Sequence, residues 1–200
     1  MRLPFTVVHS DSEARDHPAA NLHDVTPHSP GWISAPFPLF PQDIIVAFTG
    51  AVNVHRLKLL SHELFVCSKV NISVGRVARY DAPNHKTAKY SYLGFVKFQN
   101  NGQWKLREQQ TIQINQAGTF LKLSFEQAHT HSKNLCNQIG IVDMVVEGEV
   151  DLPSSERVLR AGQQGLDFMM LTQGIDLEED FVHAEARSEG MGADAVRMLR

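Results

Sequence analysis

Hydrophobic and polar residues alternate in short runs along much of this 200-residue chain. In the clearest run, Leu121, Leu123 and Phe125 alternate with Lys122 and Ser124. A period of two residues is typical of a β-strand with one buried face, because successive side chains of a strand point to opposite sides. The same kind of pattern predicts about eight strands, at 3–9, 44–49, 52–62, 70–74, 90–98, 112–114, 121–125 and 139–147. Gly50 and the segment 116–118, which ends in Gly118, are predicted to turn the chain between strands.

No convincing amphipathic helix lies between these runs. Many short strands without helices favour an all-β fold in which two antiparallel sheets pack face to face. We therefore predict an antiparallel β-sandwich of the jelly-roll type over residues 1–149. Residues 150–200 show no alternation and carry net negative charge, so we predict an acidic linker or tail there.

Six of the nine prolines lie within residues 10–41. Proline is excluded from helix interiors and central strands, so this segment is predicted to be a long loop lying over the sandwich. Four large hydrophobic residues are predicted to fasten the loop to the body: Trp32, Phe37, Leu39 and Phe40. Trp32 is expected to be buried with its indole N–H satisfied, and stacking on a ligand is the alternative.

The composition is that of an ordinary soluble globular protein, with 20% charged and 42% hydrophobic residues. No apolar run is long enough to span a membrane, and the first residues lack the pattern of a secretory signal. We expect an intracellular protein. Cys67 and Cys136 are then expected to be small buried hydrophobic residues and not a disulfide.

The net charge of −3 conceals a strongly basic middle segment. Residues 52–107 hold ten Lys and Arg against two acidic residues, whereas the segments before and after it are acidic. Such asymmetry favours an acidic partner for the middle segment, or neutralisation by the tail. The candidate basic patch is Arg56, Lys58, Lys86, Lys89, Lys105 and Arg107. The alternative is that these side chains only solvate the outer faces of strands.

The chain carries no nucleophile elbow, phosphate-binding loop, dinucleotide-binding glycine motif or zinc-protease motif. We therefore predict no enzymatic activity, no catalytic residues and no cofactor. His129, His131 and Cys136, with Cys67, could supply metal ligands, but their spacing fits no standard zinc module and we predict no metal site.

Aromatic and basic residues are interleaved at Tyr90, Tyr92, Lys97, Trp104, Lys105 and Arg107. This arrangement has some likeness to a nucleic-acid-binding sheet. No RNA-recognition motif accompanies it and the net charge is negative, so we expect no nucleic-acid partner.

Several short motifs occur in a specific order between about residues 29 and 148. They are FPQDI at 40–44, LLSH at 59–62, Ser68-Lys69, Leu93-Gly94, Arg107-Glu108 and Asn137-Gln138. In this order the chain resembles the N-terminal jelly-roll domain of the family of the centrosomal protein of 104 kDa. The resemblance implies a galactose-binding-like or discoidin-like sandwich that serves protein association at ciliary tips and centrioles. The loop at 76–89 and the acidic tail match the family poorly.

The resemblance implies a non-enzymatic interaction module of a microtubule-associated protein of the ciliary tip and centriole, with a role in cilium assembly or tip structure. The implied partners are ciliary-tip or centriolar proteins, with tubulin and microtubules as further candidates. The implied location is the cytoplasm and cytoskeleton, at the tip of the cilium or flagellum and at the centriole or basal body. The alternative function is binding of a carbohydrate or small ligand by loops at one end of the sandwich, because a fold alone does not specify a function.

Overall fold

The computed structural model describes residues 1–23, 29–77, 84–99 and 107–150. These residues form a short 3-10 helix, η1 (Ala19–Leu22), and seven strands. The strands are β1 (Phe5–Ser10), β2 (Trp32–Ile33), β3 (Gln42–Ser61), β4 (Lys69–Arg76), β5 (Lys89–Lys97), β6 (Gln109–Phe125) and β7 (Gly140–Val150). Within the described ranges no helix is long and apolar enough to cross a membrane.

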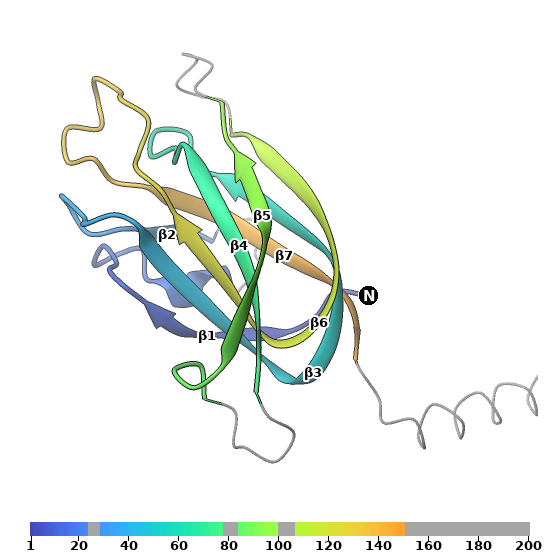
Figure 1. Ribbon diagram of the computed structural model, residues 1–200. Coiled ribbons are helices and arrows are strands. Elements are labelled where there is room, and N and C mark those ends of the chain that lie inside the picture. The colour runs from blue at the N-terminus through green and yellow to red at the C-terminus, as the bar shows by residue number, and fades with distance from the viewer. Residues whose placement is uncertain (24–28, 78–83, 100–106, 151–200) are drawn as a thin grey trace, which may run out of the picture. The chain divides into compact units, whose positions relative to one another are not determined.

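Two long strands, β3 and β6, each take part in both sheets of a sandwich (Figure 1). The first half of β3 pairs with β1 and with the second half of β6, which in turn pairs with β4, and β4 pairs with β5. The second half of β3 pairs with the first half of β6 and with β7, and β7 pairs with β2. We call these the first sheet and the second sheet. Every pairing is antiparallel, which confirms the predicted fold class.

About eight strands were predicted and the described residues form seven. The predicted boundaries between consecutive strands were wrong in two places. The runs at 44–49 and 52–62 belong to one continuous strand, β3, and those at 112–114 and 121–125 belong to β6. Gly50 and Gly118 therefore do not turn the chain. The register of β3 against β6 shifts between Ala47 and Val52, so the strand bends from one sheet into the other without ending. The short strand β2 was not predicted, because it lies in the proline-rich segment.

The alternating pattern of the sequence follows the inner faces of the two sheets. Val46, Leu57 and Leu59 of β3 are fully buried, as are Leu121 and Leu123 of β6. Burial of a side chain of this size stabilises a fold by roughly 1.5–3 kcal/mol. The polar residues between them lie on the outer faces.

The proline-rich segment is fastened to this core by Trp32, together with Ala19 and Leu22 of η1. The ring of Trp32 is fully buried, and its Nε1–H donates to the carbonyl of Ser12 at 3.0 Å, which confirms the predicted state of the indole. Phe40 is only partly buried against the core. Phe37 and Leu39 were wrongly predicted as anchors, because both side chains are largely exposed.

Cys67 and Cys136 are both free thiols. Cys67 is buried, as predicted, and burial raises the pKa of its thiol to about 12. Cys136 is only partly buried. The predicted tail lies outside the described residues, apart from Val150 at the end of β7.

Candidate functional site

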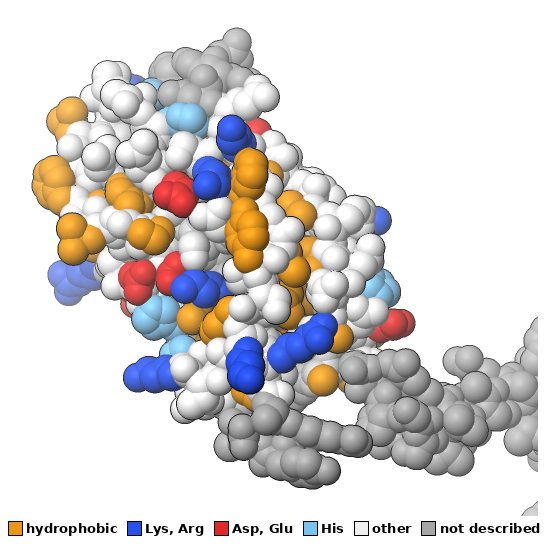
Figure 2. All heavy atoms as spheres, viewed as in Figure 1, with side chains coloured by type: hydrophobic (Ala, Val, Ile, Leu, Met, Phe, Trp, Pro, Cys, Tyr) orange, Lys and Arg blue, Asp and Glu red, His pale blue; other side chains and the backbone are white. Residues whose placement is uncertain are grey.

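Three large hydrophobic side chains are exposed together at one end of the sandwich. Phe37 and Leu39 lie on the loop between β2 and β3, and Leu135 lies on the loop between β6 and β7. Their exposed fractions are 72%, 88% and 82%. Both loops lie at the end of the sandwich away from Met1 (Figure 1), and hydrophobic side chains gather at that end of the surface (Figure 2). We call Phe37, Leu39 and Leu135 the apolar tip.

Hydrogen bonds between the two loops fix the apolar tip. The backbone N–H of Phe37 donates to the carbonyl of Cys136 at 2.7 Å. The side chain of Gln138 donates to the carbonyl of Ser34 at 2.7 Å. The hydroxyl of Ser34, a fully buried residue, accepts from the N–H of Ile139 at 3.1 Å. Leu135 is therefore held beside Phe37 although about a hundred residues separate them in sequence.

The loop that carries Leu135 is also closed on itself. The side chain of Asn134 accepts from the N–H of Gln138 at 2.9 Å and donates to the carbonyl of the same residue at 2.8 Å. Asn134 is 6% exposed, so both bonds are shielded from water. These polar groups bind within the loop itself, while Leu135 is exposed beside polar residues of the same loop such as Lys133 and Asn137.

Phe37 has a backbone conformation that is rare for a large residue. Its φ is 54°, in the left-handed region that costs a residue with a side chain of order 1 kcal/mol. This conformation turns the chain at the end of the sandwich, where the phenyl ring is in solvent. A short distance on, the side chain of Gln42 donates to the carbonyl of Leu39 at 2.5 Å. The exposed hydrophobic residues thus lie on a backbone of defined shape.

A hollow of about 320 Å³ follows Leu39 along the chain. Its lining residues are Phe40, Pro41, Ser68, Lys69, Glu126 and Gln127. Lys69 and Glu126 form a pair at 3.8 Å across it, between Nζ and Oε1. The hollow gives the apolar tip a neighbouring surface of mixed polarity, as a protein-binding site has at its rim.

The predicted basic patch is divided between several parts of the domain. Arg56 and Lys58 lie on the second half of β3, and both contact the carboxylate of Glu147 on the neighbouring strand β7. The Arg56 Nη1 atom is 3.2 Å from Glu147 Oε2. The hydrogen bond from Lys58 holds the pKa of the Glu147 carboxyl below its usual value, with a smaller effect from Arg56. These two cations are therefore partly neutralised within the domain.

The other predicted cations lie elsewhere. Lys86 is in the turn before β5, and Lys89 is the first residue of β5, in the first sheet. The Arg107 Nε atom is 3.8 Å from Glu63 Oε2. Lys105 lies outside the described residues. Arg56 and Lys58 thus lie together on the second sheet. Lys89 lies on the first sheet, and Lys86 lies in the turn before it. A role of these residues in binding a partner stays a prediction.

Three of the four side chains considered as metal ligands have other environments, and the fourth, Cys136, is a free, partly buried thiol. The Nε2 atom of His129 is 2.8 Å from the carbonyl oxygen of Phe98, and Cys67 is buried among core residues. His131 Nδ1 accepts from the N–H of Lys133 at 3.1 Å. Within the described ranges, no three His, Cys, Asp or Glu side chains come together in a way that could hold a metal ion.

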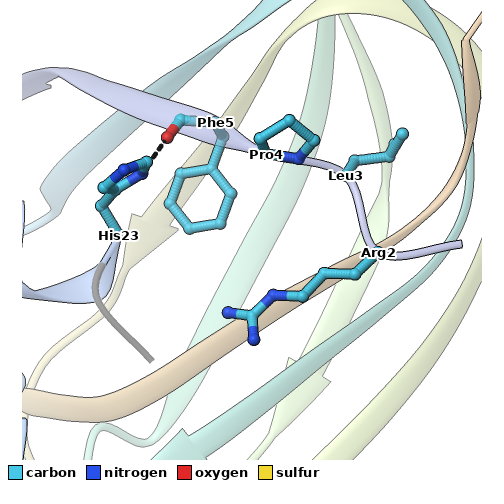
Figure 3. Close-up of a pocket in the computed structure, with 5 residues that line it drawn as sticks. All are labelled: Arg2, Leu3, Pro4, Phe5 and His23. Atoms are coloured by element: carbon cyan, nitrogen blue, oxygen red, sulfur yellow. Dashed lines mark hydrogen bonds between the residues drawn. The ribbon is translucent and has the colours of Figure 1, made fainter. Parts of the chain in front are cut away.

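A second hollow, of about 380 Å³, lies beside the start of the chain (Figure 3). Arg2, Leu3, Pro4, Phe5 and His23 line it, and the guanidinium of Arg2 extends toward the side on which His23 lies. The Nδ1 atom of His23 is already 2.5 Å from the carbonyl oxygen of Phe5. One cation among mostly apolar groups is a poor set for a specific polar ligand, so this hollow is the weaker candidate.

Residues 31–148 match the family model described as "Centrosomal protein CEP104, N-terminal domain". The chain belongs to this family. Among curated relatives, the centrosomal protein of 104 kDa from Homo sapiens is 29% identical over 151 residues and that from Mus musculus is 30% identical over 151 residues. Each alignment covers 74% of this chain and 16% of the relative, so the chain spans only a small part of their length.

Solved structures share the fold of this family member at low sequence identity. A family 32 CBM from C. perfringens NanJ, solved in complex with galactose, has a TM-score of 0.54 and 16% identity, covering 72% of this chain and 96% of that chain. The N-terminal domain of the single-strand break repair protein XRCC1 has a TM-score of 0.57 and 13% identity, covering 74% and 99%. The predicted jelly roll is thereby confirmed.

The apolar tip of this CEP104-family domain was not predicted from the sequence. The available signal was weak: Leu135 is a single large hydrophobic residue inside the polar segment HTHSKNLCNQ. Phe37 and Leu39 stand between prolines, where a buried anchor and an exposed contact have the same sequence pattern. Only the hydrogen bonds between the two loops show that these residues lie together.

Proposed function

We propose that this domain is a non-enzymatic protein-interaction module of a centrosomal protein that also acts at the ciliary tip, and that the apolar tip is its contact surface. The observation that carries the proposal is the 72–88% exposure of Phe37, Leu39 and Leu135 on loops held by hydrogen bonds. Large hydrophobic groups exposed together often mark protein-binding sites. The names of the family and of its relatives, which describe centrosomal proteins, support the cellular setting.

The chemistry of the apolar tip supports a protein partner more than a carbohydrate. A sugar site needs polar groups that converge beside an aromatic ring. Phe37 supplies a ring, but the side chains of Ser34, Asn134 and Gln138 are used to hold the loops. An apolar surface with a polar rim is what a protein anchor residue requires.

The proposed partners are centriolar and ciliary-tip proteins, with tubulin and microtubules as further candidates. Lys86, Lys89 and Arg107 would add attraction toward an acidic partner. Exposed ion pairs contribute only about 0–1 kcal/mol each and are screened by salt, so the apolar tip supplies most of the specificity in this proposal. The proposed location is the centriole or basal body and the tip of the cilium.

Site-specific photo-crosslinking in ciliated cells tests the proposal. A benzophenone amino acid is placed at Leu39 in the full-length protein, and crosslinked proteins are identified by mass spectrometry. We expect centriolar or ciliary proteins to be crosslinked at position 39, and we expect Phe37→Ser together with Leu135→Ser to reduce this crosslinking several-fold.

The matched control places the same probe at Val150, which is 46% exposed at the end of β7. The proposal fails if positions 39 and 150 capture the same proteins to the same extent. Binding of the purified chain to a glycan array, lost on Phe37→Ser, would support the carbohydrate alternative instead.

A further inference from the structure

Strand β5 is an edge of the first sheet and is unusually exposed. It pairs with β4 on one side, and no strand of the described ranges pairs with it on the other. Tyr92 and Phe95, near its centre, are 61% and 53% exposed. An edge strand has backbone N–H and C=O groups that can pair with another extended chain.

The outward face of β5 carries an aromatic row. Val70 and Ile72 of β4 are buried, so their neighbour Asn71 points outward. Phe95 lies opposite Asn71, and Tyr92 lies opposite the next outward residue of β4. A register shift in β5 places both aromatic rings on the same face although they are three residues apart. Hydrophobic side chains accordingly form a column along β5 in Figure 2.

Lysine side chains surround this aromatic row. The Nζ atoms of Lys69 and Lys97 lie 5.2 Å and 5.7 Å from the centre of the Phe95 ring, within the range of a cation–π contact. Lys89, at the start of the strand, is exposed but lies opposite Arg76, in register with the buried side of β4 and not with the aromatic row. In the part of the chain that the structure describes, neither Lys89 nor Lys97 forms an ion pair, whereas Lys69 is 3.8 Å from Glu126. The outward face of β5 is therefore aromatic and positively charged.

The inward side of the same edge is aliphatic. Leu93 and Val96 of β5 pack against the core but remain partly exposed. Ile112 and Ile114 of β6 have the same intermediate burial, and β5 and β6 contact one another. A second group of hydrophobic side chains is visible beside the column along β5 (Figure 2).

We propose that the β5 edge binds an extended segment of another protein in which acidic and hydrophobic residues alternate. Side chains of an extended chain point to opposite sides in turn. A segment lying along β5 would therefore place its hydrophobic residues toward Leu93 and Val96, and its acidic residues toward the lysines of the outward face. Backbone pairing along the edge would add affinity, as in strand addition.

The charges favour this occupant over a second copy of the chain. Lys97 already lies opposite Lys69, and Lys89 opposite Arg76, in the β4–β5 pair, so a second β5 strand would add further positive charge to a basic edge. The acidic side chains of the proposed segment would instead form favourable ion pairs with these lysines. The inference rests on the proposed role in protein interaction, but it concerns a surface distinct from the apolar tip.

The test uses the full 200-residue chain and labelled synthetic peptides of roughly ten residues, about the length of a strand. One peptide alternates Val and Glu, a second alternates Val and Lys, and a third has the composition of the first with its Glu residues in one block. Fluorescence anisotropy measures binding at low and high salt. We expect the first peptide to bind at least several-fold more tightly than the others, and to weaken as salt rises.

Two double variants test whether the peptide binds at β5. Lys89→Glu with Lys97→Glu reverses the charges, and Tyr92→Ser with Phe95→Ser removes the aromatic row. Each is expected to weaken binding of the Val-Glu peptide about three- to tenfold, as the loss of exposed contacts allows. Arg2→Glu with Arg15→Glu is the matched control, because it changes the charge by the same amount at exposed residues outside β5.

The proposal is overturned if the Val-Glu peptide binds no better than the Val-Lys peptide, or if the β5 variants bind like the control. Hydrogen exchange provides a second readout, since strand addition should slow exchange of amides in β5. The variant Phe37→Ser, Leu39→Ser and Leu135→Ser should bind the peptide normally. Loss of binding at that variant alone would assign the peptide to the apolar tip and reject the β5 site.

Discussion

Trp32 connects the proline-rich segment to the core in three ways. Its ring lies 5.2 Å from that of Phe125, between ring centres, and is fully buried. Its Nε1–H donates to Ser12, and its backbone pairs with Ile141 of β7. One residue thus fixes two stretches of the segment, before and after η1, against both sheets.

Replacement of Trp32 by Ala should lower the free energy of unfolding by about 3–5 kcal/mol, because it leaves a cavity and removes one of the two hydrogen bonds to the Ser12 carbonyl, which also accepts from the Ser10 hydroxyl. Urea unfolding followed by circular dichroism measures the change. Leu39→Ala is the control, and its effect should stay within about 0.5 kcal/mol since the side chain is 88% exposed. Equal losses in the two variants would contradict this account.

Sequence patterns identified Trp32 as buried but assigned Phe37 and Leu39 the same role. All three are large hydrophobic residues in one proline-rich segment, and size and hydrophobicity do not separate them. The difference arises from the positive φ of Phe37 and from bonds to residues 134–138 in a distant loop. Contacts so remote in sequence leave no periodic signal.

Strands β3 and β6 determine the architecture, because each passes from one sheet to the other. Gly118 of β6 lies against β4: a methyl group added there would be 2.2 Å from Cγ1 of Val74 and 3.0 Å from the carbonyl oxygen of Gly75. Gly50 of β3 has nothing within 4 Å of the same position. The space beside the backbone therefore excludes a larger residue at Gly118 but not at Gly50.

Gly118→Ala should destabilise the domain by about 1–3 kcal/mol, since β4 must move to accept the methyl group. Gly50→Ala should be neutral or stabilise slightly, because alanine restricts the unfolded chain. Thermal unfolding of the two variants side by side measures the difference. Equal midpoints would show that β4 and β6 are not as closely packed as described.

At the level of elements, the sequence predicted the strand residues well and the strand ends poorly. Glycine is common in turns, so Gly50 and Gly118 were interpreted as ends of strands. In the structure, Gly50 lies in a bend of β3, and Gly118 is in close contact with β4. A glycine can either turn the chain or allow a neighbouring strand to pack closely against it. Which of the two applies depends on the strand beside it, and the local sequence does not specify that strand.

The stability of the whole domain should depend on the protonation of His62. Its Nδ1 accepts from the N–H of Leu64 at 3.0 Å, a bond that only the unprotonated nitrogen can form. Burial lowers the pKa of this imidazole, with smaller effects from Arg107 and His17, against an opposing effect of Glu63. The folded domain therefore binds this proton less readily than the unfolded chain does.

The free energy of unfolding should fall as the pH drops below about 6.5, the usual histidine pKa, because the unfolded chain then takes up a proton that the folded domain resists. His62→Gln should remove this part of the pH dependence. Urea unfolding at several pH values between about 5 and 8 measures both slopes. An unchanged slope in the variant would assign the effect to other groups.

The sequence indicates an excess of cationic side chains in residues 52–107, but not how these side chains are distributed over the surface. Arg56 and Lys58 share Glu147, which lies 91 and 89 residues further along the chain. Lys89 and Lys97 form no ion pair among the described residues, and they lie opposite Arg76 and Lys69 of β4. Strand register decides which cations are neutralised, and register follows from the whole fold.

The position of β7 has a mechanical consequence. This strand lies between β2 and β3, and at its end the backbone of Gly148 exchanges two hydrogen bonds with Met1, at 3.0 Å and 2.8 Å. A pull on the end of β7 directed along the strand would strain the bonds to its neighbours together in shear, so that they share the force. Strand β5, with its single neighbour, would instead be peeled away one bond at a time. Tension directed along β7 is thus resisted within the second sheet, to which the β5 edge does not belong.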